Sequence, residues 1–240
     1  MPRLDVLVTR NGLAESRERA QALILAGKVR VGEETVRRPD RSVSEDAPIS
    51  VEAGPDYASR GALKLGPALE DFGVDPAGIV CADIGASTGG FTDILLRRGA
   101  ARVYALDVGR GLLHWRIRQD PRVVVIERVN AREMQSFPER VQLVVIDVSF
   151  ISLDKVLPAV LRSAPEADVV ALFKPQFEVG RSEVGKGGIV RDESAVEAAL
   201  ARFRDWCARN GYSVLGTAWS KVAGAEGNRE IFVHLRPGQP

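Results

Sequence analysis

Residues 79–91, IVCADIGASTGGF, place a short apolar run directly before a glycine-rich turn. A strand, a glycine turn and the start of a helix are typical of the first unit of a doubly wound α/β fold, where the turn lets a ligand approach the backbone. The spacing from Gly85 to Gly90 is Gly-x-x-x-Gly-Gly, not the Gly-x-Gly-x-x-Gly of dinucleotide-binding enzymes. It favours an adenosyl ligand without a pyrophosphate, the alternative being an ordinary tight turn.

Alternating strand and helix patterns extend from this turn towards the C-terminus. They predict a mainly parallel, doubly wound sheet. The last two strand patterns have no helix between them, which predicts an antiparallel final hairpin. The predicted strands are 79–83, 102–107, 123–126, 143–147, 168–174, 212–218 and 230–235, and the predicted helices are 90–97, 112–117, 152–161 and 193–210.

An acidic residue ends the second predicted strand. Asp107 follows Gly85 by 22 residues. A carboxylate in that place can accept hydrogen bonds from both ribose hydroxyls of an adenosine. A plain helix-capping aspartate is the alternative, but the glycine turn and the acid together favour a ligand site.

The N-terminal part of the chain has a different texture, with short and charged segments. Residues 3–11 predict a helix that ends at Gly12, and Ser16 is placed to cap a second helix that runs to Leu25. Residues 28–31, 35–36 and 49–51 alternate like short strands. We therefore expect a small α+β domain over residues 1–56 and the large domain over residues 57–240.

Four ionisable residues fall where a doubly wound sheet would bring them to one edge: Lys64, Asp147, Lys174 and Glu230. Each alone could be a surface charge. Lys174, however, directly follows Val-Val-Ala-Leu-Phe, and burying its charge costs several kcal/mol unless partners compensate. Two lysines alternating with two carboxylates form such a compensated cluster. It suits removal of a proton from a hydroxyl, because a second lysine nearby favours the neutral form that a base requires.

The composition limits the other possibilities. The 240 residues carry 33 basic and 32 acidic side chains, a formal charge of +1, so a site for nucleic acid must be a local patch. The two cysteines indicate no disulfide framework, and His114 and His234 belong to no metal-ligand spacing. No signal peptide or membrane-spanning run is present in the sequence, so we expect a cytoplasmic protein without a membrane or metal partner.

The N-terminal pattern resembles the S4 domain, an RNA-binding fold. The resemblance covers residues 2–52 and rests on Arg3-Leu4-Asp5, Arg10-x-Gly12-Leu13, Ser16-Arg17, Ala20, Gly27 and Val29-x-Val31. A merely solvated helix surface is the alternative, since Glu15 and Glu18 accompany the arginines. The resemblance implies RNA-binding roles for Arg3, Arg10, Ser16, Arg17, Arg19, Lys28 and Arg30.

The four ionisable residues, in their local contexts, resemble the K-D-K-E tetrad of FtsJ-type ribose 2′-O-methyltransferases. Those contexts are Ser59-Arg60-Gly61-Ala62-x-Lys64, Asp147-x-Ser149-Phe150-Ile151-Ser152, Lys174-Pro175-Gln176-Phe177-Glu178 and Gly227-Asn228-x-Glu230. With the S4-like segment in front, the chain resembles the TlyA family of rRNA cytidine 2′-O-methyltransferases, whose members are often named hemolysins. One departure is residues 56–58, which lack a tryptophan that some members carry.

This resemblance implies a Rossmann-like methyltransferase domain that uses S-adenosyl-L-methionine and has Lys174 as the general base. It implies cofactor-binding roles for Asp83, Gly85, Ser87, Gly89, Gly90, Phe91, Asp107 and Asn130. The short ends of the chain match family members that modify only the large ribosomal subunit, with modification of both 16S and 23S rRNA as the alternative. A nicotinamide-dependent dehydrogenase, a membrane-active hemolysin and a catalytically silent RNA-binding protein are rival interpretations.

Overall fold

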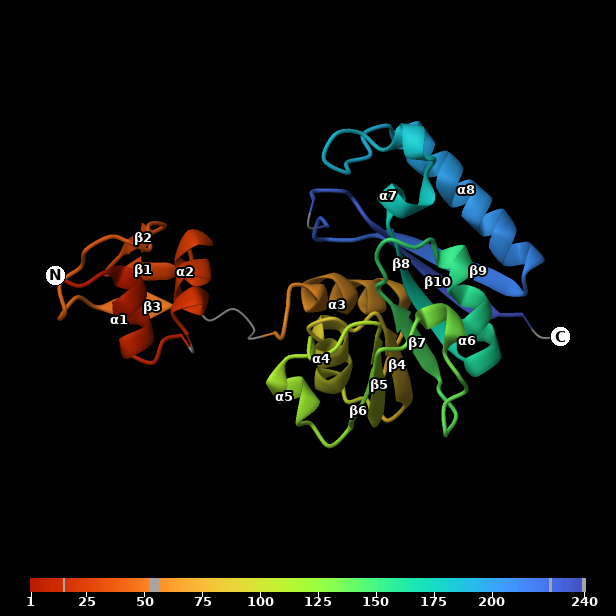
Figure 1. The fold of residues 1–240 in the computed structure, drawn as a ribbon, viewed down its shortest axis with the longest axis horizontal. Helices are drawn as coiled ribbons and strands as arrows, with labels where there is room; N and C mark the ends of the chain where they lie inside the picture. The colour runs from red at the N-terminus through yellow and green to blue at the C-terminus, as the bar shows by residue number, and fades with distance from the viewer. Residues whose placement is uncertain (15, 52–56, 225, 239–240) are drawn as a thin grey trace. The chain divides into compact units, whose positions relative to one another are not determined.

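The computed structural model describes residues 1–14, 16–51, 57–224 and 226–238, apart from the side chain of Arg19. The chain divides into two compact units, Met1–Asp56 and Tyr57–Pro240, each with its own hydrophobic core (Figure 1).

The N-terminal unit packs two helices on a small antiparallel sheet. Its elements are α1 (Leu4–Arg10), α2 (Arg17–Leu25), β1 (Val29–Val31), β2 (Glu34–Val36) and β3 (Ile49–Val51). The strand order is β2-β1-β3, and the two helices face the same apolar cluster. Leu4 and Leu7 of α1 and Ile24 of α2 are fully buried there, because residues three and four apart share one side of a helix. The expected helix–helix–sheet order is confirmed.

A buried carboxylate organises the two helices of this unit. The side chain of Asp5 is fully buried and accepts hydrogen bonds from Arg3, Arg17 and Gln21. Three donors around one carboxylate compensate the cost of its burial. The hydrogen bond from Arg3 is the largest cause that holds the pKa of Asp5 well below its usual range, and the bonds from Gln21 and Arg17 act in the same direction.

We expect replacement of Asp5 by Ala to destabilise the N-terminal unit by about 1.5–3 kcal/mol, the usual loss for hydrogen bonds to a charged group. The folded pKa of Asp5 lies below its unfolded value, so the stabilisation is complete above the ordinary aspartate range and is lost as the pH falls below it. Thermal unfolding of the wild type, Asp5→Ala and Asp5→Asn at pH 7 and pH 3 measures this. A wild type no more acid-sensitive than Asp5→Asn would contradict the prediction.

The C-terminal unit is built on a seven-stranded sheet in the order β6-β5-β4-β7-β8-β10-β9. The first five strands in this order are parallel, and β10 pairs antiparallel with both β8 and β9. The doubly wound sheet and its antiparallel final hairpin are therefore confirmed. The strands are β4 (Val80–Ile84), β5 (Arg102–Asp107), β6 (Val123–Glu127), β7 (Leu143–Ile146), β8 (Asp168–Phe173), β9 (Tyr212–Trp219) and β10 (Ile231–Pro237).

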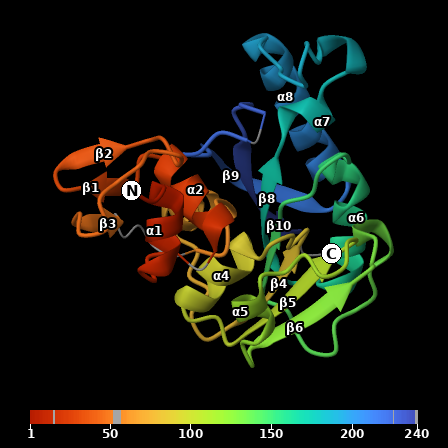
Figure 2. The same cartoon turned by 60° about the vertical axis from the view of Figure 1, so that its left-hand side comes forward.

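Helices cover both faces of this sheet (Figures 1 and 2). On one face α3 (Gly61–Phe72), α4 (Gly90–Arg97) and α5 (Trp115–Arg118) enclose a core, and on the other α6 (Leu157–Ser163) and α8 (Glu193–Arg209) enclose a second. Central strands are apolar on both sides, as Val144 and Val145 of β7 show by facing opposite cores. The sheet and its covering helices hold the polar groups at the carboxyl ends of the parallel strands together at one edge.

Two predicted helices are shorter than expected. The segment 112–117 becomes helical only at Trp115, where the His114 ring accepts a hydrogen bond from the Arg116 backbone. The segment 152–161 divides into a 3₁₀ turn at Leu153–Lys155 and α6, and Pro158 lies in the first turn of α6, where its missing N–H is not needed for the helix. A short helix, α7 (Pro175–Glu178), which the periodicity did not indicate, follows β8 directly.

Candidate active site

The glycine turn between β4 and α4 brings three parts of the chain into close contact. Gly85 has a φ of +86° and lies against the carbonyl of Asp147, so a Cβ there would collide with backbone. Gly90 begins α4 and lies against Ser59 and Gly61 at the start of α3. Gly85 therefore allows the ends of β4 and β7 to approach closely, and Gly90 allows the starts of α3 and α4 to do the same.

Asp107 lies at the end of β5 and faces this turn. One of its oxygens accepts a hydrogen bond from the Ser87 backbone N–H at 2.8 Å, and the other accepts one from the Gly109 N–H at 2.7 Å. Each carboxylate oxygen keeps a second lone pair for a further donor. Asp107 is thus held rigidly, with capacity left for the hydroxyls of a ligand.

A cavity of about 490 Å³ opens beside Asp107. Its size is typical of small-molecule sites, and its position at the carboxyl ends of β4, β5 and β7 is the usual ligand crevice of open α/β sheets. One end is formed by the cofactor candidates and the other by residues that follow β7. The lining residues are Gly85, Ser87, Leu106, Asp107, Val108, Leu112, Val129, Asn130, Ala131, Arg132, Asp147, Val148, Ser149, Phe150 and Ile151.

Four of the eight cofactor candidates line this cavity: Gly85, Ser87, Asp107 and Asn130. Asn130 caps a 3₁₀ turn by accepting a hydrogen bond from the Arg132 N–H, which fixes the direction of its side chain. The remaining candidates, Asp83, Gly89, Gly90 and Phe91, are not among the residues that line the cavity.

Asp83 shows most clearly that a cofactor candidate can lie outside the cavity lining. Its side chain is fully buried, and one oxygen accepts a 2.6 Å hydrogen bond from the Thr92 hydroxyl on α4. Burial raises the pKa of Asp83 to about 7, with the hydrogen bond from Thr92 acting in the opposite direction. Asp83 thus joins β4 to α4 beneath the glycine turn.

The four ionisable residues form two adjacent ion pairs. Lys174 Nζ, directly after β8, lies 2.6 Å from Asp147 Oδ1, directly after β7. Lys64 Nζ on α3 lies 2.7 Å from Glu230 Oε2, directly before β10. Ile231 pairs with Phe173 in the sheet, so Glu230 and Lys174 occupy the same edge. Lys174 and Glu230 are buried, which removes competing water and strengthens both pairs.

Lys174 is connected to the cavity through two of its lining residues. Its Nζ contacts Asp147 and also donates a 2.9 Å hydrogen bond to Ser149 Oγ. Sequence reasoning did not assign a role to Ser149, although it lies within the quoted motif. A hydroxyl two residues after a strand-end carboxylate is the signal that could have indicated it.

Two further residues at this edge were not selected from the sequence. Phe150 has a φ of +63° and is 88% exposed at the mouth of the cavity, in contact with Phe177 of α7. The exposed Phe150 ring, on a backbone with positive φ, has no evident role in folding.

Asn228 is buried. Its side chain donates a hydrogen bond to the Gly188 carbonyl and accepts one from the Val190 N–H, which connects the loop before α8 to the turn that carries Glu230.

The RNA-binding candidates of the N-terminal unit lie on or near its surface. Arg3 and Arg17 share the carboxylate of Asp5 but remain about half exposed, at 46% and 51% of their side chains. Arg10 pairs with Glu45 and Arg30 donates to the Glu33 carbonyl, both at the surface. Ser16 and Lys28 are partly buried, and the side chain of Arg19 lies outside the described residues.

The described residues contain no cluster of His, Cys, Asp and Glu that could hold a metal ion. Among the described helices, none combines the length and apolar character that crossing a membrane requires.

Strand order, glycine turn and strand-end acid together define a Rossmann-like methyltransferase. The profile of FtsJ-like methyltransferases matches residues 57–237, and the profile of the S4 domain matches residues 2–49. The chain belongs to the TlyA family, which joins these two domains, and the resemblance drawn from the sequence is confirmed. A nicotinamide-dependent dehydrogenase is therefore excluded.

Three relatives show the extent of the similarity. The 16S/23S rRNA (cytidine-2′-O)-methyltransferase TlyA of Mycobacterium tuberculosis is 47% identical over 239 residues, covering 98% of this chain and 89% of the relative. The 23S rRNA (cytidine-2′-O)-methyltransferase TlyA of Campylobacter jejuni is 40% identical, covering 74% and 70%. A solved structure of a hemolysin-named protein from Streptococcus thermophilus has a TM-score of 0.78 and 40% identity, covering 99% and 88%.

Proposed function

We propose that this enzyme transfers a methyl group from S-adenosyl-L-methionine to the 2′-hydroxyl of a cytidine in ribosomal RNA. The observation that carries the proposal is the continuity of one cavity, which has Asp107 at one end and, at the other, Asp147 and Ser149 in contact with Lys174. A methyl donor bound at Asp107 and an RNA 2′-hydroxyl bound beside Lys174 would face each other inside this cavity.

The residues around the cavity fit this cofactor. Asp107 can accept hydrogen bonds from two ribose hydroxyls, and Gly85 of the glycine turn lines the same cavity. Exposed Val108 and Leu112 supply apolar surface on the same side for an adenine ring. When bound, the cofactor supplies an electrophilic methyl group.

Lys174 is the proposed general base. In its neutral form its Nζ takes the proton of the 2′-hydroxyl as the oxygen attacks, and general-base catalysis of this kind contributes about 10²–10⁴-fold. Asp147 and Ser149 fix the position of Nζ, and Asp147 stabilises the ammonium ion that forms. Glu230 pairs with Lys64 at 2.7 Å and so holds the second lysine of the cluster in place.

Several features support a nucleic-acid substrate. The S4 domain supplies an RNA-binding unit, and the relatives from M. tuberculosis and C. jejuni are named as rRNA methyltransferases. Phe150 presents an exposed ring in the lining of the same cavity, suited to stacking on a nucleobase that has left its helix. A ribosomal substrate would place the enzyme in the cytoplasm. Mass-spectrometric mapping of ribose methylation in rRNA from cells with and without the gene tests the proposal, and identical maps would refute it.

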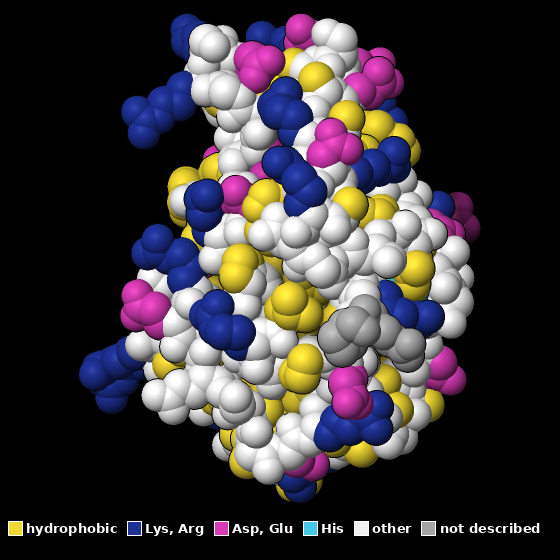
Figure 3. Space-filling model, turned by 90° about the vertical axis from the view of Figure 1, so that its right-hand side faces the viewer, with side chains coloured by type: hydrophobic (Ala, Val, Ile, Leu, Met, Phe, Trp, Pro, Cys, Tyr) yellow, Lys and Arg dark blue, Asp and Glu magenta, His cyan; other side chains and the backbone are white. Residues whose placement is uncertain are grey.

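Recognition of the RNA is local and not driven by overall charge. On the face drawn in Figure 3, Lys and Arg side chains are interspersed with acidic and apolar ones. We expect the triple variant Arg10→Ala, Lys28→Ala and Arg30→Ala to bind rRNA more weakly and to lower the salt dependence of log Kd by about two, at roughly 0.7 per lost phosphate contact. Filter binding over a salt series measures this, with Arg209→Ala on α8 as the control. An unchanged slope would show that the S4 basic residues make no phosphate contacts.

We propose the large-subunit RNA as the principal substrate, because 23S rRNA is common to the names of both rRNA-modifying relatives. Incubation of isolated subunits with labelled cofactor should therefore label the large subunit efficiently. Labelling of the small subunit at a comparable rate would contradict this preference for the large subunit and favour the alternative of two substrates.

A further inference from the structure

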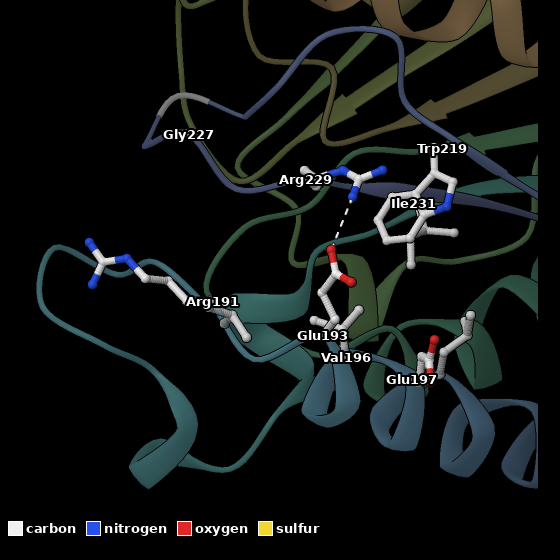
Figure 4. Close-up of a pocket in the computed structure, with 10 residues that line it drawn as sticks. Arg191, Glu193, Val196, Glu197, Trp219, Gly227, Arg229 and Ile231 are labelled. Atoms are coloured by element: carbon white, nitrogen blue, oxygen red, sulfur yellow. Dashed lines mark hydrogen bonds and ion pairs between the residues drawn. The ribbon is translucent and has the colours of Figure 1, made fainter.

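A second cavity, of about 480 Å³, lies next to the tetrad on the other face of the sheet (Figure 4). Its walls come from the first turns of α8, the end of β9, the start of β10 and the loops that precede α8 and β10. Ile231 lines this cavity and packs in the core beneath α8, whereas the preceding Glu230 reaches Lys64 of α3 on the opposite face. The cavity therefore borders the edge of the sheet at which Lys174 lies.

The walls of this cavity combine an aromatic ring with a guanidinium group. Trp219 is 46% exposed at the end of β9, the edge strand of the sheet. The Arg229 guanidinium lies 4.2 Å from the centre of the Trp219 ring. Arg229 also reaches Glu193 at 3.3 Å, as the dashed line in Figure 4 marks. Such side chains, a flat ring and a guanidinium plane, are those on which unpaired bases stack in RNA complexes.

The charges of the cavity suit a base better than a phosphate. Arg191 and Arg229 are matched by Glu193 and Glu197, so the lining carries no net charge to attract a polyanion. Figure 4 shows Arg191 on the rim, pointing away from the cavity. The exposed carboxylates can instead accept hydrogen bonds from the amino group of a base, while buried Val196 provides apolar contact.

We infer that this cavity binds a nucleobase of the substrate RNA that neighbours the methylated nucleotide. The base stacks on the exposed part of Trp219 beside Arg229, and its amino group donates to Glu193. The inference rests on the proposed function, since it assigns the cavity to the same RNA. It also gives Arg229, the residue directly before Glu230, a role in holding the RNA at the catalytic edge.

Steady-state methylation by the full chain tests this assignment. Trp219→Ala should raise the KM for the RNA substrate about 5- to 150-fold, the factor expected for losing one base–aromatic stack, with kcat nearly unchanged. Trp219→Phe keeps a ring and should recover most of the affinity. Leu215→Ala removes an exposed apolar side chain from the same strand outside this cavity and should leave KM unchanged. Equal KM values for wild type and Trp219→Ala overturn the assignment, whereas a wild type that methylates no RNA refutes the proposed function itself.

A binding measurement separates RNA from a ribosomal protein as the occupant. With Trp115 and Trp206 replaced by Phe, Trp219 is the single tryptophan, and a protein-free rRNA fragment that contains the mapped nucleotide should quench its emission. Calorimetry with S-adenosyl-L-methionine should give the same affinity for Trp219→Ala as for the wild type, which controls for folding. No quenching by the fragment, together with a KM defect only on intact subunits, would assign the cavity to a ribosomal protein and overturn the inference.

Discussion

Replacement of Lys174 by Ala is expected to lower the rate of methyl transfer by about 10²–10⁴-fold, the range for loss of a general base. Lys174 is buried, and its Nζ contacts both Asp147 and Ser149 at the inner end of the cavity. Its removal takes away the only basic nitrogen that the structure's described part places in contact with both of these residues. Single-turnover assays with labelled cofactor measure the loss.

Lys174→Arg is the matched control for charge. A guanidinium keeps the positive charge beside Asp147 but does not lose its proton in proteins, so it cannot act as a base. We therefore expect Lys174→Arg to be almost as inactive as Lys174→Ala. Both variants should bind the cofactor with wild-type affinity, because Lys174 does not line the Asp107 end of the cavity. Substantial turnover by either variant would rule out Lys174 as the base.

Replacement of Asp107 by Ala is expected to weaken binding of S-adenosyl-L-methionine about 10- to 150-fold, the equivalent of about 1.5–3 kcal/mol for a charge-assisted hydrogen bond. The structure adds a second reason for a large effect. Asp107 also accepts hydrogen bonds from the Ser87 and Gly109 backbone N–H groups, so its loss should loosen the glycine turn at the edge of the cavity. Isothermal calorimetry gives the affinity directly.

Asp107→Asn separates these two contributions. An amide oxygen can still accept from one backbone N–H, but it carries no charge for the ribose hydroxyls. We expect an affinity between those of the wild type and Asp107→Ala. If the wild type, Asp107→Ala and Asp107→Asn bind the cofactor with equal affinity, Asp107 does not bind the cofactor's ribose and the cofactor lies elsewhere in the cavity.

Much of the fold followed from local patterns. Parallel strands that alternate with helices must place their carboxyl ends at one edge, so the strand ends at Asp107, Asp147 and Lys174 could be assigned to that edge from the sequence. Ends of elements were less predictable, as the helix expected at 112–117 shows, because a single His114 cap and nearby glycines decide where its turns begin.

The choice among candidate residues needed the tertiary structure. Asp83 and Asp107 both lie at or near the ends of strands that lead to the glycine turn, yet Asp83 is buried against Thr92 while Asp107 lines the cavity. Phe150 and Asn228 depend on contacts with segments distant along the chain, which no local pattern encodes.

The sequence alone determined the classes of the two domains, the mainly parallel, doubly wound sheet with its antiparallel final hairpin, and the presence of two lysines and two carboxylates at one edge of that sheet. Periodicity and strand-end position are local properties, so they can be read without coordinates. Only the tertiary structure decided how those charges pair, that Lys174 reaches the cavity through Asp147 and Ser149, and that a second cavity lies beneath Glu230. These depend on distances between side chains brought together from separate elements, which packing sets.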